Sequence, residues 1–248
     1  MDLKTLIAIP CMGSAPIEFM ESFTKLQKPP ETSFTILTNT LIHDARNIIA
    51  QNAIDAGFDR VMWFDSDMTF EPDTLLRLSA DMDTGLDYVS GLYYTRRLPN
   101  IRPVAYDRMW YKVLEDGTYE AGAIEKYKYF HGLNECAGTG FGCCLTSVDL
   151  LRRVSDEFGS PFAPIPCMGE DLSFCWRVAQ IGVTMYVDAS VLCGHIGKKI
   201  FTQDDCNSRI VRCKDCWKRD FDNCPFNEFS MYVPEAYFYC AEGEVKNK

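Results

Sequence analysis

The sequence predicts an α/β fold in which helices cover both faces of one sheet. Short apolar segments of strand length alternate with segments of helical spacing along most of the chain. Glycine often marks the junctions, as Gly57 and Gly182 do at the ends of two helical segments. The 248 residues are 47% hydrophobic and 13% aromatic, which suffices for a sizeable core. We expect one α/β domain over residues 1–200 and a cysteine-rich extension over residues 201–248.

The first half of the chain contains four predicted strands and three predicted helices. Pro10 stops the first apolar strand, and Pro72 stands at the opening of the third helix. The second helix has apolar residues at helical spacing and stops at Gly57. In chain order the elements are strand 3–10, helix 17–26, strand 33–40, helix 41–57, strand 60–67, helix 71–85 and strand 88–94.

The second half begins with a less regular stretch, residues 95–133, which is rich in Tyr, Arg and Gly. This composition indicates a hairpin or a flexible flap. Regular elements then return, and they end near residue 200. In chain order they are strand 138–147, helix 148–154, helix 169–182, and a last strand with its exit over residues 183–197.

Charge and hydropathy argue against several classes of protein. The net charge of −10 argues against a general nucleic-acid binder, although the basic TRR stretch at residues 95–97 could line a local pocket. The start has no signal-peptide pattern, and no apolar run is long enough to cross a bilayer. We expect a soluble cytoplasmic protein, in which the twelve cysteines are thiols or metal ligands rather than disulfides.

Two aspartates one residue apart, Asp65 and Asp67, follow the apolar segment VMWF. In an open α/β sheet, ligands collect at the carboxyl ends of strands. Side chains two residues apart in an extended chain lie on the same side, so both carboxylates could face one hard cation, Mg²⁺ or Mn²⁺. Such an ion would keep open positions for diphosphate oxygens. The alternative is an ordinary Asx-type turn at a strand end.

Two further motifs carry candidate chemistry. Glu170 and Asp171 open a helix in the GED segment. Acidic residues there favour the positive end of the helix dipole, but Asp171 could also act as a general base because a nearby acid raises its pKa. His195 lies between glycines after the last strand, where a neutral imidazole could bind a metal ion. An ordinary loop histidine is the alternative.

The ordered set of D-S-D, G-E-D and G-H-I-G resembles the GT-A glycosyltransferases, especially the family 2-like enzymes. The resemblance covers most of residues 3–200. It implies a Rossmann-like mixed sheet flanked by helices, a nucleotide-sugar donor such as a UDP- or GDP-sugar, and Mn²⁺ or Mg²⁺. The loop IPCMGS lacks the polar residues that often follow this proline in the family, which leaves the identity of the base open.

The resemblance also implies roles for individual residues. The first strand end would hold base and ribose, the D-S-D turn would hold ribose and metal, the acid at the start of the later helix would be the base, and the histidine would bind metal. In this sequence the donor-binding positions are Pro10, Cys11, Met12, Asp65 and Ser66, the metal ligands are Asp65, Asp67 and His195, and the catalytic acids are Asp171 with Glu170 beside it.

The chemistry supports a metal-dependent glycosyltransferase independently. A cation held by Asp67 and His195 would neutralise charge on the leaving diphosphate, while Asp171 takes the acceptor's proton. Inversion or retention and the acceptor stay open. One alternative is a nucleotidyltransferase acting on sugar phosphates, although the first loop lacks the basic residues that grip a triphosphate. Another is a catalytically silent module that binds a partner through its cysteine-rich tail.

Three other features have two interpretations each. Arg46 could meet the nucleotide or diphosphate, or could be a surface arginine. The glycines of AGTGFGCC could let a sugar approach the backbone, or could form β-bulges. Trp110 and Tyr111 could stack on an acceptor sugar, or could be packed aromatics.

The extension has the cysteine spacing C-x6-C-x2-C-x7-C. One C-x2-C pair is half of a typical zinc knuckle, and the other half does not match this pattern. A structural Zn²⁺ would explain how so short a segment becomes ordered, and buried or surface thiols are the alternative. The four candidate ligands are Cys206, Cys213, Cys216 and Cys224.

Overall fold

The computed structural model divides the chain into two compact units, Met1–Thr202 and Gln203–Lys248. The residues that it describes are 3–96, 100–197, 199–204, 211–212 and 239–240. In the second unit, β14 (Val211–Arg212) pairs antiparallel with β15 (Tyr239–Cys240). The four predicted zinc ligands lie outside the described residues, so the zinc site stays a prediction.

The first unit is built on a mixed seven-stranded sheet of order β2-β1-β3-β10-β5-β11-β8. Parallel pairing joins β2, β1 and β3, and also β5 and β11, whereas β10 runs antiparallel between β3 and β5 and β8 pairs antiparallel with β11. The strands are β1 (Thr5–Cys11), β2 (Thr32–Thr38), β3 (Arg60–Phe64), β5 (Tyr88–Leu92), β8 (Leu133–Cys136), β10 (Cys143–Ser147) and β11 (Met185–Leu192).

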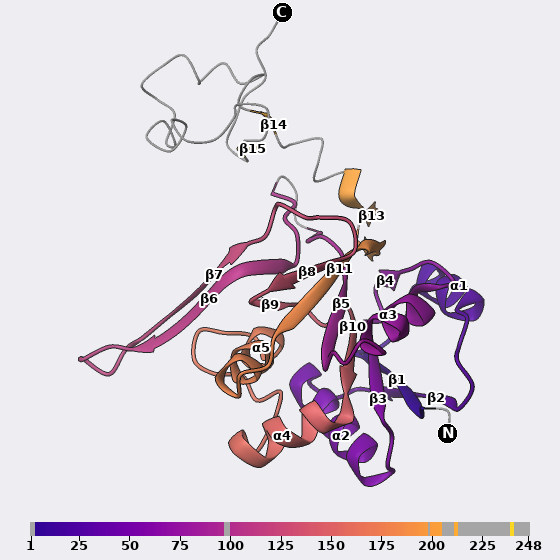
Figure 1. Cartoon of the computed structure of the whole chain (residues 1–248), viewed down its shortest axis with the longest axis horizontal. Helices are drawn as coiled ribbons and strands as arrows, with labels where there is room; N and C mark the ends of the chain where they lie inside the picture. The colour runs from indigo at the N-terminus through magenta and orange to yellow at the C-terminus, as the bar shows by residue number, and fades with distance from the viewer. Residues whose placement is uncertain (1–2, 97–99, 198, 205–210, 213–238, 241–248) are drawn as a thin grey trace, which may run out of the picture. The chain divides into compact units, whose positions relative to one another are not determined.

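Helices cover both faces of this sheet, as the alternation in the sequence predicts (Figure 1). On one face, Phe19 and Leu75 pack with Ile7 and Phe64 in a large apolar cluster. On the other face, Trp63 packs edge-on against Phe162. The helices are α1 (Ile17–Lys25) and α3 (Thr74–Met82) on the first face, and α2 (Ile42–Asp55), α4 (Val148–Phe158) and α5 (Glu170–Gln180) on the second.

Several boundaries differ from the prediction, and the strand expected over residues 138–147 is two strands, β9 (Gly138–Thr139) and β10, in different sheets. The helix expected over residues 148–154 continues to Phe158 and ends at Gly159, whose φ of 80° suits glycine. Residues 183–197 were expected to form a strand and its exit, and the exit itself forms a short strand, β12 (Gly194–Ile196), after the chain leaves β11. In a second, three-stranded sheet, β12 pairs with β4 (Met68–Thr69) and with β13 (Ile200–Phe201).

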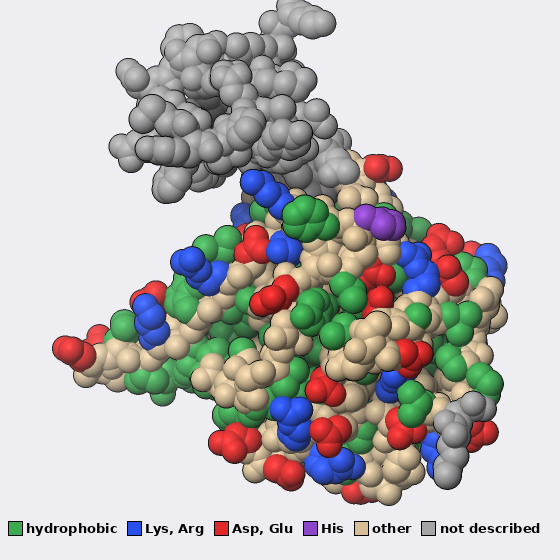
Figure 2. Space-filling model, in the orientation of Figure 1, with side chains coloured by type: hydrophobic (Ala, Val, Ile, Leu, Met, Phe, Trp, Pro, Cys, Tyr) green, Lys and Arg blue, Asp and Glu red, His purple; other side chains and the backbone are tan. Residues whose placement is uncertain are grey.

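The irregular middle of the chain is a hairpin, which is one of the two structures expected there. Its strands are β6 (Ala105–Val113) and β7 (Tyr119–Glu125), and β6 also pairs with β9 (Gly138–Thr139). The hairpin projects from the first unit as a long arm (Figure 1). Hydrophobic side chains are visible along the arm in Figure 2, and Val113 is 62% exposed.

No helix among the described residues is both long and apolar enough to span a membrane. The cysteines whose side chains the structure describes are free thiols, and most of them are buried.

Asp81 on α3 lies near Asp188 on β11, and burial together with that neighbouring carboxylate raises the pKa of Asp81 to about 6. Between about pH 4 and pH 6 the folded chain therefore holds more protons than the unfolded chain, so this group lowers stability as pH rises through that window. We expect Asp81→Asn to be more stable than wild type at pH 8, with the difference vanishing near pH 4.

Urea unfolding at the two pH values measures this difference. Asp156→Asn is the control, because Asp156 is exposed on α4 and should change stability equally little at both pH values. If Asp81→Asn raised the free energy of unfolding as much at pH 4 as at pH 8, the raised pKa of Asp81 would not be the cause of the gain in stability.

Candidate functional site

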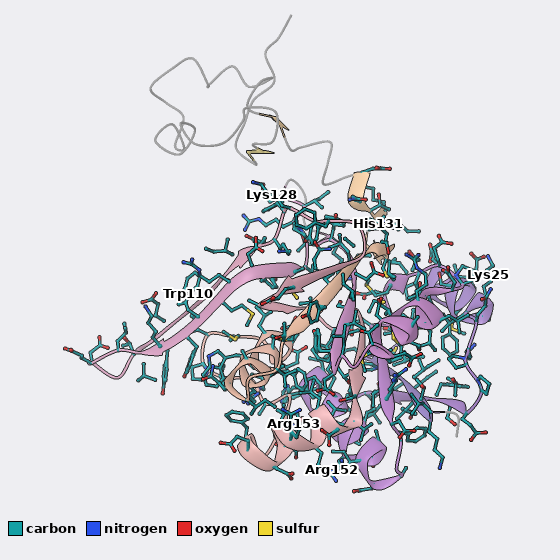
Figure 3. All side chains as sticks on the ribbon, in the orientation of Figure 1. Lys25, Trp110, Lys128, His131, Arg152 and Arg153 are labelled. Carbon is teal, nitrogen blue, oxygen red and sulfur yellow. The ribbon has the colours of Figure 1, made fainter. Side chains whose placement is uncertain are left out.

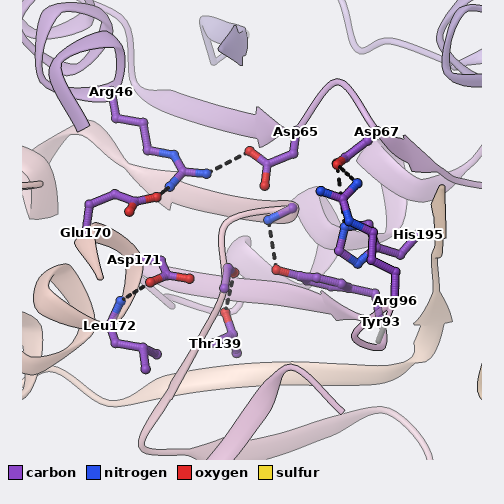
Figure 4. A network of polar contacts seen from close by, with 12 residues as sticks. Arg46, Asp65, Asp67, Tyr93, Arg96, Thr139, Glu170, Asp171, Leu172 and His195 are labelled. Atoms are coloured by element: carbon purple, nitrogen blue, oxygen red, sulfur yellow. Dashed lines mark hydrogen bonds and ion pairs between the residues drawn. The ribbon is translucent and has the colours of Figure 1, made fainter. Parts of the chain in front are cut away.

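The candidate site lies where β3 ends, beside the start of α5. Asp65 follows the last residue of β3, and its backbone N–H donates to the Gly142 carbonyl at 3.1 Å. The chain then turns, because the Met68 N–H donates back to the Asp65 carbonyl at 3.2 Å. The expectation of an extended D-S-D segment with both carboxylates on one side is therefore wrong. Asp65 and Asp67 engage different partners (Figure 4).

Arg46 on α2 bridges two of the predicted acids. Its side chain is 3% exposed, and it donates to Asp65 Oδ1 at 2.7 Å and to Glu170 Oε1. Burial alone would lower the pKa of Arg46, but the carboxylates of Asp65, Glu170 and Asp171 raise it overall. Arg46 is thus not a surface arginine. It is a buried cation that joins the end of β3 to the start of α5, next to the candidate base.

Asp171 has the properties that a general base requires. Its Oδ1 accepts a hydrogen bond from the Leu172 N–H at 2.7 Å at the first turn of α5. Burial and then the charge of Glu170 raise the pKa of Asp171 to about 6, against the lowering effect of Arg46. At neutral pH this carboxylate is ionised and is more basic than a solvated aspartate.

The base of the β6–β7 hairpin lies near Asp171. Burial and then the charge of Asp171 raise the pKa of Tyr106, near the start of β6, to about 12. The base of the hairpin is therefore close to the candidate base.

His195 and Asp67 form the candidate metal-binding pair. The His195 Nδ1 lies 2.9 Å from the Tyr94 carbonyl oxygen. A carbonyl can only accept, so Nδ1 carries a proton, and in the neutral imidazole Nε2 presents its lone pair. Nε2 lies 3.7 Å from Asp67 Oδ2, close enough for both atoms to contact one ion. Burial favours a raised pKa for Asp67, but His195 and Arg96 lower it overall.

The donor set fits a weakly held hard cation that shares its coordination with a ligand. Among the described residues no cluster of three or more His, Cys, Asp or Glu side chains could hold an ion. Mg²⁺ is often bound by one or two protein side chains, with substrate phosphates and water completing the coordination. Asp67 supplies a carboxylate of that kind, and His195 adds an imidazole nitrogen, which is a softer ligand. Asp65 is committed to Arg46 through Oδ1, and only its other oxygen is free of this ion pair.

Two further contributors to this site, Tyr93 and Arg96, lie in the GLYYTRR segment, which the sequence offered as one wall of a donor site without naming their partners. Arg96 donates to Asp67 Oδ2 and, at 2.9 Å, to the Ile196 carbonyl. The Tyr93 ring packs edge-on against His195 with centroids 5.7 Å apart, and its hydroxyl accepts from the Gly142 N–H at 3.0 Å. The signal available in the sequence was the YYTRR segment directly after a buried strand, where binding residues are expected.

The remaining predicted donor-binding residues lie at the same end of the sheet. Pro10 and Cys11 are buried at the carboxyl end of β1, which pairs in parallel with β3. Met12 is 64% exposed in the loop that follows, and Ser66 is partly exposed in the turn between the aspartates. The shared role of the first strand end and the acids as a donor site stays a prediction.

The glycines of AGTGFGCC are needed for packing against protein side chains. A β-carbon on Gly140 would lie 2.1 Å from the Tyr93 hydroxyl oxygen, and one on Gly138 would lie 2.6 Å from the Met109 sulfur. At Gly142 the nearest atom would be Tyr93 Cζ at 2.9 Å. These glycines let Tyr93 and the hairpin approach the sheet closely.

Trp110 and Tyr111 both lie on the hairpin arm, where Figure 3 labels Trp110. Trp110 lies over Gly122 and donates from Nε1 to Glu120 at 3.0 Å. Tyr111 packs edge-on against Trp176 of α5, with centroids 5.6 Å apart. Both aromatic side chains make intramolecular contacts, and sugar stacking on them stays a prediction.

Comparisons with known proteins bear on the fold. Neither a protein-family model nor a curated protein sequence matches this chain. Solved structures do match it, among them A197 from STIV, which is 19% identical with a TM-score of 0.56 over 81% of this chain and 94% of that one. GalNAc-T7, crystallised with UDP, GalNAc and Mn²⁺, is 11% identical with a TM-score of 0.52 over 79% of this chain and 44% of that one.

The chain has a GT-A-like glycosyltransferase fold. At these identities the likeness shows the fold alone, and it confirms the predicted mixed sheet flanked by helices. In this GT-A-like fold the D-S-D turn follows β3, the G-E-D acids open α5, and the histidine lies on β12. The three motifs that suggested the resemblance thus lie at one end of the sheet.

Proposed function

We propose that this chain is a metal-dependent glycosyltransferase that moves a sugar from a UDP- or GDP-sugar to an acceptor hydroxyl. The observation that carries the proposal is the side-by-side arrangement of a basic carboxylate, Asp171, and a buried arginine-carboxylate bridge at the end of β3. The GT-A-like fold adds support, because its neighbour GalNAc-T7 was crystallised with UDP, GalNAc and Mn²⁺.

In this proposal the donor binds across the carboxyl ends of β1 and β3. Pro10, Cys11 and Met12 contact base and ribose, and Ser66 and the free oxygen of Asp65 meet the ribose. Arg46 contacts Asp65 rather than the donor, because its guanidinium is buried and is held by both of its carboxylate partners. Its role is therefore to position Asp65 and Glu170 rather than to reach the diphosphate.

Asp67 and His195 would hold Mn²⁺ or Mg²⁺, which would supply positive charge to the leaving diphosphate. The Tyr94 carbonyl keeps the proton on His195 Nδ1 and so leaves Nε2 available. Asp171 accepts the proton of the acceptor hydroxyl as the new glycosidic bond forms. Glu170 keeps the carboxylate of Asp171 basic through its negative charge.

Release of UDP or GDP from a panel of UDP- and GDP-sugars, with and without Mn²⁺, tests the proposal. We expect metal-dependent release from at least one donor, and chelation with EDTA should remove it. Release of pyrophosphate from a nucleoside triphosphate and a sugar phosphate would instead favour the nucleotidyltransferase. A chain that binds and turns over none of these compounds would match the silent binding module.

A further inference from the structure

Arg96 already provides a positive charge at the place where the metal ion is expected. Its guanidinium donates to Asp67 Oδ2, and this is the same oxygen that lies 3.7 Å from His195 Nε2 (Figure 4). The two protein atoms that would hold the ion are thus an imidazole nitrogen and an oxygen that is already paired with a cation.

A divalent ion and the guanidinium compete for this oxygen. An ion bound by Asp67 Oδ2 and His195 Nε2 would lie within a few ångströms of the guanidinium, and like charges at that distance repel. The remaining contact of the guanidinium is to a backbone carbonyl, that of Ile196, at 2.9 Å. This neutral contact does not offset the repulsion, so Arg96 must leave Asp67 when the ion binds.

Arg96 is placed so that it can leave. Its side chain is 47% exposed, and a half-exposed ion pair contributes little net stability. The segment that carries it is anchored just outside the arginine, because Tyr94 bridges to Pro103 and the Thr95 N–H donates to the Arg102 carbonyl at 2.8 Å. The backbone at Tyr94 and Thr95 is therefore held, and the exposed side chain of Arg96 can change partner without moving these two residues.

We infer that Arg96 is an exchangeable counter-cation, which neutralises Asp67 in the absence of metal and turns to the donor's diphosphate when a divalent ion takes its place. The inference rests on the proposed function. An arginine matches phosphate oxygens as well as it matches a carboxylate, so the displaced guanidinium gains a new anionic partner only when nucleotide is present. Metal alone must displace Arg96 without that gain.

This exchange couples metal binding to nucleotide binding. Arg96 weakens the binding of free Mn²⁺, because the ion has to break the ion pair with Asp67. Arg96 also strengthens the binding of Mn²⁺ together with UDP, because the guanidinium then pairs with the diphosphate. Two ligands that each bias the same side chain raise each other's affinity by the same factor.

Mn²⁺ titrations followed by electron paramagnetic resonance, with and without UDP or GDP, test the exchange without any turnover. We expect Arg96→Gln to bind free Mn²⁺ more tightly than wild type by up to about fivefold, the upper limit that loss of one half-exposed ion pair corresponds to. With nucleotide added, the affinity of wild type for Mn²⁺ should rise by about tenfold or more, and the affinity of Arg96→Gln should rise by much less.

Arg153→Gln is the matched control. Arg153 lies on α4, its side chain is 42% exposed, and it pairs with Asp87 at 3.4 Å. It is not part of the candidate site. This variant should bind Mn²⁺ like wild type. Asp67→Asn should lose Mn²⁺ binding. Thermal unfolding of each variant checks that it is folded.

The outcomes separate the two proposals. If wild type and Arg96→Gln have the same affinity for Mn²⁺ without nucleotide, and also the same affinity with nucleotide, the exchange is wrong and the proposed function survives. The exchange is also wrong if Arg96→Gln binds free Mn²⁺ more weakly than wild type. If no variant binds Mn²⁺ even with either nucleotide, both the exchange and the metal-dependent function are wrong.

Discussion

Replacing Asp171 by asparagine is expected to lower the rate constant of sugar transfer by about 10²- to 10⁴-fold, the range that general base catalysis typically contributes. Asparagine keeps the shape of the side chain but cannot accept the acceptor's proton. Donor binding should change little, because Asp171 is not among the residues that hold the donor. Steady-state kinetics and a nucleotide-binding titration measure the two effects separately.

The same residue predicts how the rate depends on pH. Because burial and Glu170 raise the pKa of Asp171 to about 6, the carboxylate gains a proton as pH falls through about 6 and can then no longer accept one. The wild-type rate should therefore fall on the acid side of pH 6, and the residual rate of Asp171→Asn should lack this limb. An Asp171→Asn variant that transfers sugar at the wild-type rate would exclude Asp171 as the base.

Replacing Arg46 by methionine is expected to lower the free energy of unfolding by about 3 kcal/mol, near the lower end of the range for breaking a buried ion pair. The change leaves the carboxylates of Asp65 and Glu170 facing each other without the cation between them. Both carboxylates keep some contact with water, since their side chains are 31% and 18% exposed, which limits the loss. Urea unfolding measures it.

A double-mutant cycle shows whether the loss comes from the unpaired acids. Glu170→Gln should cost stability in wild type, where it breaks the pair, and should cost less or even help in the Arg46→Met background. Arg153→Gln, which removes an exposed pair with Asp87, should change stability by under about 1 kcal/mol. Additive effects of Arg46→Met and Glu170→Gln would mean that the bridge is not a coupled unit.

Local sequence patterns predicted most of the helices and strands of the first unit. Burial of a few neighbouring residues produces the apolar runs of β1 and β3 and the helical spacing of α2. Such local patterns can be read directly from the sequence. The placement of β10 could not be predicted in this way. Its antiparallel insertion between β3 and β5 depends on pairings with segments about 50 to 80 residues away, and periodicity does not encode direction or order.

The candidate site shows the same division. The acids and His195 could be named because each follows or opens a regular element. The partners of these residues could not be named, since Arg46 meets Glu170 from 124 residues away and Arg96 meets Asp67 from 29 residues away. A buried arginine and a surface arginine look alike in sequence, because only the carboxylates that converge on the guanidinium distinguish them.

The small sheet that contains β4 and β12 has a consequence for how this protein can change over evolution. His195 pairs directly with Met68, the neighbour of Asp67, and the Ile196 N–H donates to the Asp67 carbonyl at 2.7 Å. Main-chain bonds, rather than the identities of the two side chains, thus keep positions 67 and 195 adjacent. In the proposed metal site, exchanging either residue for another type of ligand would alter which ion is preferred while leaving the position of the site unchanged.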